Sequence, residues 1–107
     1  MSDSGKSKFL SVVDIDGIKA LCVRYKVRSL FLFGSAVSDP DSARDVDFAV
    51  EFGPASPAEH VERYFGLMEG IQSLLGKPVD LVEMRAIRNP FFKQEIEEKK
   101  VLLYDAA

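Results

Sequence analysis

The sequence contains few of the residues on which several common kinds of site depend. Its 107 residues include one cysteine, Cys22, one histidine, His60, and no tryptophan. A single cysteine excludes a disulfide within these residues and a cysteine-based zinc site, and a single histidine excludes a histidine-rich metal centre. Cys22 falls among regularly spaced apolar residues, so we interpret it as a core residue.

Long apolar runs and an excess of positive charge are also lacking. No run approaches the roughly 20 apolar residues of a membrane-spanning helix, and residues 1–8 lack the apolar core of a signal peptide. We therefore expect a cytoplasmic protein without membrane contact. The formal net charge of −3 argues against broad nucleic-acid binding, which depends on excess lysine and arginine. It remains compatible with binding one nucleotide, because a metal ion can supply positive charge locally.

The remaining composition is that of an ordinary globular domain. Hydrophobic residues make up 47% and charged residues 29% of the chain, which argues against disorder and against collagen-like or coiled-coil structure. The length fits one domain. We expect a flexible N-terminus over residues 1–10 and a single domain over residues 11–107.

The apolar pattern predicts alternating helices and strands. Apolar residues at three- and four-residue spacing predict a helix beginning at an N-cap, Asp14. The sequence from Ser56 to Glu59 is a capping box with proline at the first helical position. The helix that it opens carries an apolar stripe, which we expect to be buried, at Val61, Phe65, Met68, Ile71 and Leu75. Asn89-Pro90 predicts a third helix through about residue 99. Strands are predicted at residues 30–33, 45–52, 78–83 and 101–104. This mixture indicates an α+β (mixed α/β) fold with a mixed central sheet.

Three aspartates are the candidate catalytic residues. Asp45 and Asp47 alternate with apolar residues, so both carboxylates project from one face of a strand. Asp80 lies in a short strand with apolar neighbours. Carboxylates held together repel one another unless a cation lies between them, and Mg²⁺ prefers one or two carboxylates plus phosphate oxygens. Taken alone, Asp45 and Asp47 also fit a solvent-facing strand edge.

A glycine-serine pair favours the interpretation as a site. Gly34 directly follows the buried strand at residues 30–33, where the absence of a Cβ lets the backbone approach a ligand. The hydroxyl of Ser35 and nearby N–H groups can donate to a phosphate. Arg44 is either a further phosphate contact or a loop charge. We interpret Glu51 as solvent-facing, His60 as exposed, and Lys99 as part of a solvated face.

The motif Phe33-Gly34-Ser35, followed after nine residues by Asp45-Val46-Asp47, resembles the signature of the DNA polymerase β-like nucleotidyltransferases. The stretch from about Asp16 to Tyr104, which includes Val79-Asp80-Leu81-Val82, is more closely similar to the minimal nucleotidyltransferase family. The resemblance implies a nucleotidyltransferase fold and transfer of AMP from ATP. It also implies that Gly34 and Ser35 hold the triphosphate, with Arg44 as a further nucleotide-binding candidate.

The resemblance further implies a metal site and a partner. Asp45 and Asp47 would each bind two Mg²⁺ ions, for which Mn²⁺ can substitute, and Asp80 would bind the catalytic ion. Many stand-alone family members are antitoxins that attach AMP to a tyrosine of a HEPN-domain RNase toxin. The family commonly carries arginines after Gly-Ser, whereas this sequence continues Ala36-Val37. A contact-only antitoxin with a weakened phosphate loop is therefore the alternative, and modification of a small molecule is a third hypothesis.

Overall fold

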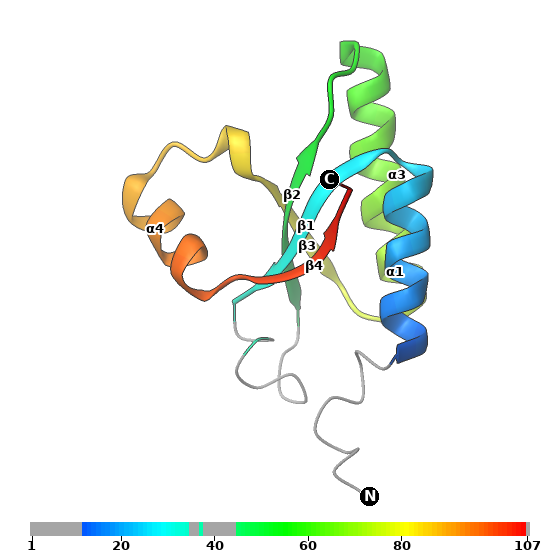
Figure 1. The fold of residues 1–107 in the computed structure, drawn as a ribbon, viewed down its shortest axis with the longest axis horizontal. Coiled ribbons are helices and arrows are strands. Elements are labelled where there is room, and N and C mark those ends of the chain that lie inside the picture. The colour runs from blue at the N-terminus through cyan, green and yellow to red at the C-terminus, as the bar shows by residue number, and fades with distance from the viewer. Residues whose placement is uncertain (1–11, 35–36, 38–44, 107) are drawn as a thin grey trace, which may run out of the picture.

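The computed structural model describes residues 12–34, 37 and 45–106. The described elements follow one another as α1 (Val12–Arg24), β1 (Val27–Phe33), β2 (Val46–Phe52), α3 (Pro57–Leu75), β3 (Val79–Glu83), the 3₁₀ turn η2 (Met84–Ala86), α4 (Pro90–Lys99) and β4 (Val101–Asp105). This arrangement confirms the predicted α+β fold with a mixed sheet (Figure 1). Within the described part of the chain, no helix is both long and apolar enough to cross a membrane.

The four described strands form one sheet in the order β3-β2-β1-β4. β1 pairs antiparallel with both β2 and β4, whereas β2 and β3 run parallel. Parallel strands require a long crossover connection, and α3 provides it between β2 and β3. The mixed sheet therefore follows from one crossover helix placed among antiparallel connections.

Helices cover both faces of the sheet (Figure 1). α1 and α3 lie on one face, above a core that includes Leu30, Phe48 and Ile71, each completely buried. α4 lies on the other face, where its Ile96 packs in a smaller cluster with Phe33 and Ala49. Because both faces are covered, β1 carries apolar side chains on both sides, as its sequence predicts.

Local sequence signals set the ends of the helices. Ser56 and Glu59 form the predicted capping box at the start of α3, and Gly76 ends that helix in the left-handed conformation. The side chain of Asn89 accepts hydrogen bonds from two backbone N–H groups at the start of α4. The prediction for Asp14 is wrong, because α1 already begins at Val12. Asp14 lies in the first turn, where a carboxylate complements the helix dipole.

The buried stripe of α3 differs from the predicted one in the first part of the helix. Ile71 is fully buried, and Met68 and Leu75 pack against the core, as predicted. Val61 and Phe65 are instead 55% and 48% exposed, and Leu67 is fully buried. The helix is rotated so that Tyr64, directly before Phe65, reaches β3 and donates its hydroxyl hydrogen to the Leu81 carbonyl. Tyr64 therefore lies on the side of α3 that faces the sheet, and Phe65 lies outside it.

Candidate active site

Asp47 and Asp80 lie side by side on adjacent strands. The parallel register of β2 and β3 places Asp47 directly beside Asp80. Both residues alternate with side chains that pack beneath α1 and α3, so both face the α4 side of the sheet. Asp47 is half-buried and Asp80 is exposed. Asp45 is exposed and directly precedes β2.

The carboxylates influence one another electrostatically. Burial raises the pKa of Asp47, and the nearby charges of Asp80 and Asp45 raise it further. The three groups are therefore close enough for repulsion, and a cation would relieve that repulsion. Among the residues that the structure describes, no three potential ligand side chains are already gathered in a metal cage. The oxygen-only donor set fits Mg²⁺, which commonly takes one or two carboxylates and completes its coordination with water and phosphate.

The backbone conformation at position 34 and the lack of space for a Cβ there both require glycine. Its φ angle is +82°, a conformation that residues with a Cβ rarely adopt. A Cβ at this position would overlap the Asp47 carboxylate oxygen and would lie 3.1 Å from Cγ and 3.2 Å from Cβ of Asp47. Gly34 follows Phe33, whose register partner is Asp47. The end of β1 is therefore packed directly against a candidate catalytic carboxylate.

A cavity of about 630 Å³ opens beside this contact. Its volume lies within the range of about 300–1,000 Å³ that is usual for small-molecule sites. The residues that line it are Phe33, Gly34, Val37, Asp47, Phe92, Glu95 and Lys99. The rings of Phe33 and Phe92 meet edge to face with centroids 6.1 Å apart, which anchors the first turn of α4 to the end of β1.

Two features of this cavity were not predicted from the sequence. Lys99 is exposed, as its position in a charged segment predicts, but it also lines the cavity together with Asp47. Glu95 lies on the same wall, one turn earlier on α4. Their four-residue spacing is a helical signal, but only the packing of α4 across the sheet shows which face they share. Ser35 and Arg44 lie outside the described residues, so their proposed contacts with nucleotide stay predictions.

Two other sequence interpretations need revision. Glu51 accepts a hydrogen bond from the Ser29 hydroxyl at 3.2 Å, so it has a partner on β1. His60 is not simply exposed, because its Nε2 lies 2.7 Å from Oε2 of Glu83 and its ring meets Phe52 edge to face. Neither residue lines the cavity beside Asp47.

Comparison with known proteins identifies the family. The family model described as "Polymerase beta, Nucleotidyltransferase" matches residues 16–107. The chain belongs to this nucleotidyltransferase family. A relative from Methanocaldococcus jannaschii, provisionally named a protein adenylyltransferase, is 40% identical over 81 residues, which cover 75% of this chain and 80% of the relative. The resemblance inferred from the Gly-Ser and Asp-x-Asp motifs is thereby confirmed.

Solved structures share the fold of this nucleotidyltransferase. One is the complex of a tri-AMPylated Shewanella oneidensis HEPN toxin with an MNT antitoxin, matched at a TM-score of 0.61 and 23% identity over 88% of this chain and 71% of the other. A toxin-antitoxin structure with AMP-PNP matches at a TM-score of 0.64 and 24% identity, covering 86% and 73% of the two chains. At these identities the likeness establishes the fold.

Proposed function

We propose that this nucleotidyltransferase transfers AMP from ATP to a hydroxyl group of a partner protein in the cytoplasm. The observation that carries the proposal is the close approach of Gly34 to Asp47, whose carboxylate fills the space that a Cβ on Gly34 would occupy and which lies in register with Asp80. Backbone without a side chain thus lies next to two neighbouring carboxylates, and one of them, Asp47, lines a cavity of about 630 Å³. These are the groups that transfer of a nucleotide from a triphosphate requires.

The side chains have distinct proposed roles. Asp45 and Asp47 hold two Mg²⁺ ions, with Mn²⁺ as a substitute, and Asp80 holds one of them. When bound, the ions neutralise charge on the phosphates and stabilise the attacking and leaving oxygens. Gly34, with Ser35 and Arg44, holds the triphosphate. Asp80 is the most exposed carboxylate of the β2–β3 pair, so an acceptor hydroxyl can approach from its side.

Two comparisons support a protein acceptor. The Methanocaldococcus jannaschii relative carries the provisional name of protein adenylyltransferase. The Shewanella oneidensis structure pairs the shared fold with a HEPN toxin that bears three AMP groups. We therefore propose an antitoxin whose partner is a HEPN-type RNase toxin and whose acceptor is a tyrosine of that toxin.

A second candidate is an antitoxin that acts by contact alone. The sequence after Gly34-Ser35 continues Ala36-Val37, where the family commonly carries arginines. A phosphate loop without these cations favours a nucleotidyltransferase fold that inhibits its partner without modifying it. The two candidates differ in whether inhibition requires the carboxylates.

Labelling with α-³²P-ATP tests the proposal. We expect the wild-type protein with its cognate partner and Mg²⁺ to label the partner, and EDTA or the change Asp47→Asn to abolish labelling. Glu51→Gln is the matched control, because it removes a carboxylate from the same face of β2 while keeping an acceptor for Ser29. If the partner stays unlabelled and is inhibited equally by wild type and Asp47→Asn, the contact-only function is correct.

A further inference from the structure

The strand that carries Asp80 is an edge strand within the described sheet. β3 stands at one end of the order β3-β2-β1-β4, so β2 is its one strand neighbour there. The N–H of Val46 on β2 donates to the carbonyl of Pro78 at 3.0 Å. Because successive residues of a strand direct their backbone groups to opposite edges, the backbone groups of Val79 and Leu81 point away from β2.

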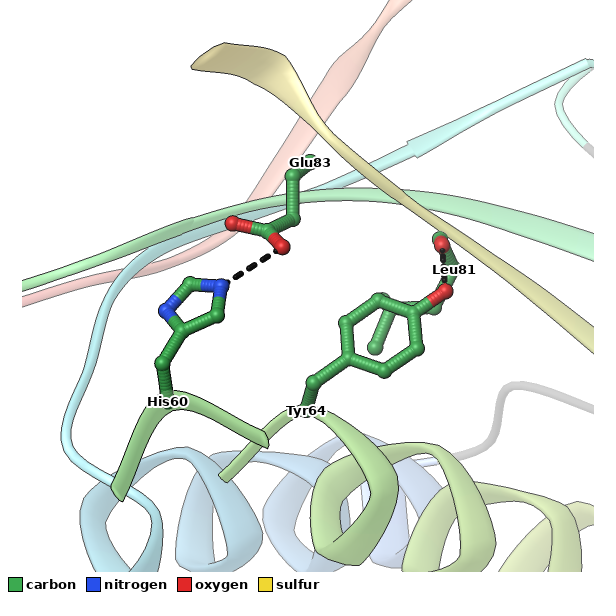
Figure 2. Close-up of polar contacts among 4 residues, drawn as sticks. All are labelled: His60, Tyr64, Leu81 and Glu83. Carbon is green, nitrogen blue, oxygen red and sulfur yellow. Dashed lines mark hydrogen bonds and ion pairs between the residues drawn. The ribbon is translucent and has the colours of Figure 1, made fainter. Parts of the chain in front are cut away.

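Two side chains of α3 bind this outer edge. The N–H of Val79 donates to Oε1 of Gln72 at 3.1 Å. The hydroxyl of Tyr64 donates to the carbonyl of Leu81 (Figure 2). These two backbone groups belong to the residues immediately before and after Asp80. Side chains of the crossover helix therefore occupy hydrogen-bonding positions that a further strand would otherwise take.

A third side chain of α3 also contacts β3. His60 of α3 bonds Glu83 at the end of β3, beside the contact of Tyr64 (Figure 2). His60, Tyr64 and Gln72 each bond a residue of β3, so all three reach toward that strand from α3. The phenol of Tyr64 is a hydrogen-bond donor at neutral pH with an ordinary tyrosine pKa of about 10, and burial and the charges of Asp80 and Glu83 raise that pKa further.

We propose that Tyr64 and Gln72 are positioning residues that hold the backbone on both sides of Asp80, and so fix where its carboxylate meets the metal and nucleotide. This inference rests on the proposed function for the role of Asp80. Neither residue lines the cavity beside Asp47, so each acts through β3. Partners that orient a metal-binding group commonly contribute about 10- to 100-fold in metal affinity or activity.

Three substitutions and one control separate positioning from general stability. Tyr64→Phe removes only the hydroxyl, and Gln72→Met removes the acceptor while keeping an unbranched side chain of similar length. Gln72→Glu keeps an oxygen acceptor for Val79 and should restore the wild-type behaviour. Tyr25→Phe is the control, because it also removes a tyrosine hydroxyl, from a ring that packs against Gly66 of α3.

The measurements combine activity with two readouts that do not depend on it. Mn²⁺ affinity is followed by electron paramagnetic resonance with AMP-PNP present, and β3 amide exchange is followed by NMR. We expect Tyr64→Phe and Gln72→Met to weaken Mn²⁺ binding and lower kcat about tenfold, with KM for ATP unchanged. Exchange of β3 amides should accelerate about fivefold, the equivalent of one hydrogen bond.

The outcomes separate this inference from the proposed function. Unchanged Mn²⁺ affinity and kcat in Tyr64→Phe and Gln72→Met would overturn it, even with faster exchange, because the contacts would then be structural only. Wild-type protein that binds no Mn²⁺, or Gln72→Glu as weak as Gln72→Met, would overturn it as well. If wild type labels no partner but Mn²⁺ affinity follows the expected pattern, the inference stands and the proposed function fails. Should Tyr64→Phe not fold, the two Gln72 variants decide.

Discussion

Replacing Gly34 by alanine should lower both nucleotide affinity and stability. Gly76→Ala, which should lower stability alone, is the matched control. Both glycines have positive φ angles, +82° and +68°. A Cβ at Gly76 would have nothing within 4 Å, whereas one at Gly34 would press on Asp47. The left-handed conformation costs an alanine about 1–2 kcal/mol. Part of this cost is offset by about 0.4–1 kcal/mol, because alanine restricts the unfolded chain.

The structure gives different magnitudes for the two variants. Gly76→Ala should lose about 1 kcal/mol of unfolding free energy from backbone strain alone. Gly34→Ala should lose about 1–2 kcal/mol more, because crowding a packed site costs that much. Rotating the Asp47 carboxylate would relieve the crowding only in part, since Cβ of Asp47 is itself only 3.2 Å from the added Cβ. Each kcal/mol corresponds to about 4–8 °C in Tm for a domain near this size.

Thermal unfolding and calorimetric titration with Mg²⁺ and AMP-PNP measure the two effects. We expect Gly76→Ala to bind the nucleotide as wild type does. Gly34→Ala should lose at least tenfold in affinity, because Asp47 has to move from its place beside Asp80. Equal Tm values for the two variants, together with wild-type nucleotide affinity in Gly34→Ala, would refute the reasoning that Gly34 and Asp47 form one site.

Three further predictions concern side chains at other places. Ser56→Ala should cost about 1 kcal/mol in chemical denaturation at pH 7. The backbone N–H of Ser56, and then its side chain, lower the pKa of Glu59, so the stability from the carboxylate is present above the unfolded pKa of Glu59 and is lost as pH falls through the folded one. Ser56→Ala keeps that N–H, so Glu59→Gln is the variant that tests the pH dependence, and a loss that stays constant into acid would contradict it. Burial raises the pKa of the Cys22 thiol to about 12, so dithionitrobenzoate should react at pH 8 only after denaturant is added, and rapid reaction of the native protein would contradict its core placement. Lys99→Met should weaken AMP-PNP binding several-fold without lowering Tm, because Lys99 lines the cavity beside Asp47; unchanged affinity would leave Lys99 as a surface residue.

The parts of the fold that could be predicted depend on neighbours in the sequence. The capping box at Ser56 and the N-cap at Asn89 each satisfy backbone N–H groups within three residues, so their effect is readable without tertiary structure. The alternation around Asp47 likewise identifies which carboxylates share a strand face. The family motifs made Gly34 and the aspartates candidates, and the structure adds that the Asp47 side chain fills the space that a Cβ on Gly34 would occupy.

The parts that could not be predicted depend on how distant elements pack. Lys99 is exposed as predicted, but no local pattern tells that α4 crosses the sheet so that Lys99 lines the cavity beside Asp47. Val61 and Phe65 follow a helical apolar spacing that predicts burial, yet both are exposed, while Tyr64 contacts β3 and Leu67 is fully buried. For Val61 and Phe65 the tertiary packing overrides a local preference.

The crossover helix also explains why Asp80 reaches the correct face of the sheet. Shifting β3 by one residue would turn Asp80 toward the core beneath α3 and turn Val79 outward. The apolar alternation of Val79 and Leu81 opposes that shift, since both side chains are buried. The contacts of Gln72 and Tyr64 oppose it independently, because they bind backbone groups that alternate with the same period. The helix that brings β3 parallel to β2 thus also fixes its register, and Asp47 and Asp80 meet although 32 residues separate them in the chain.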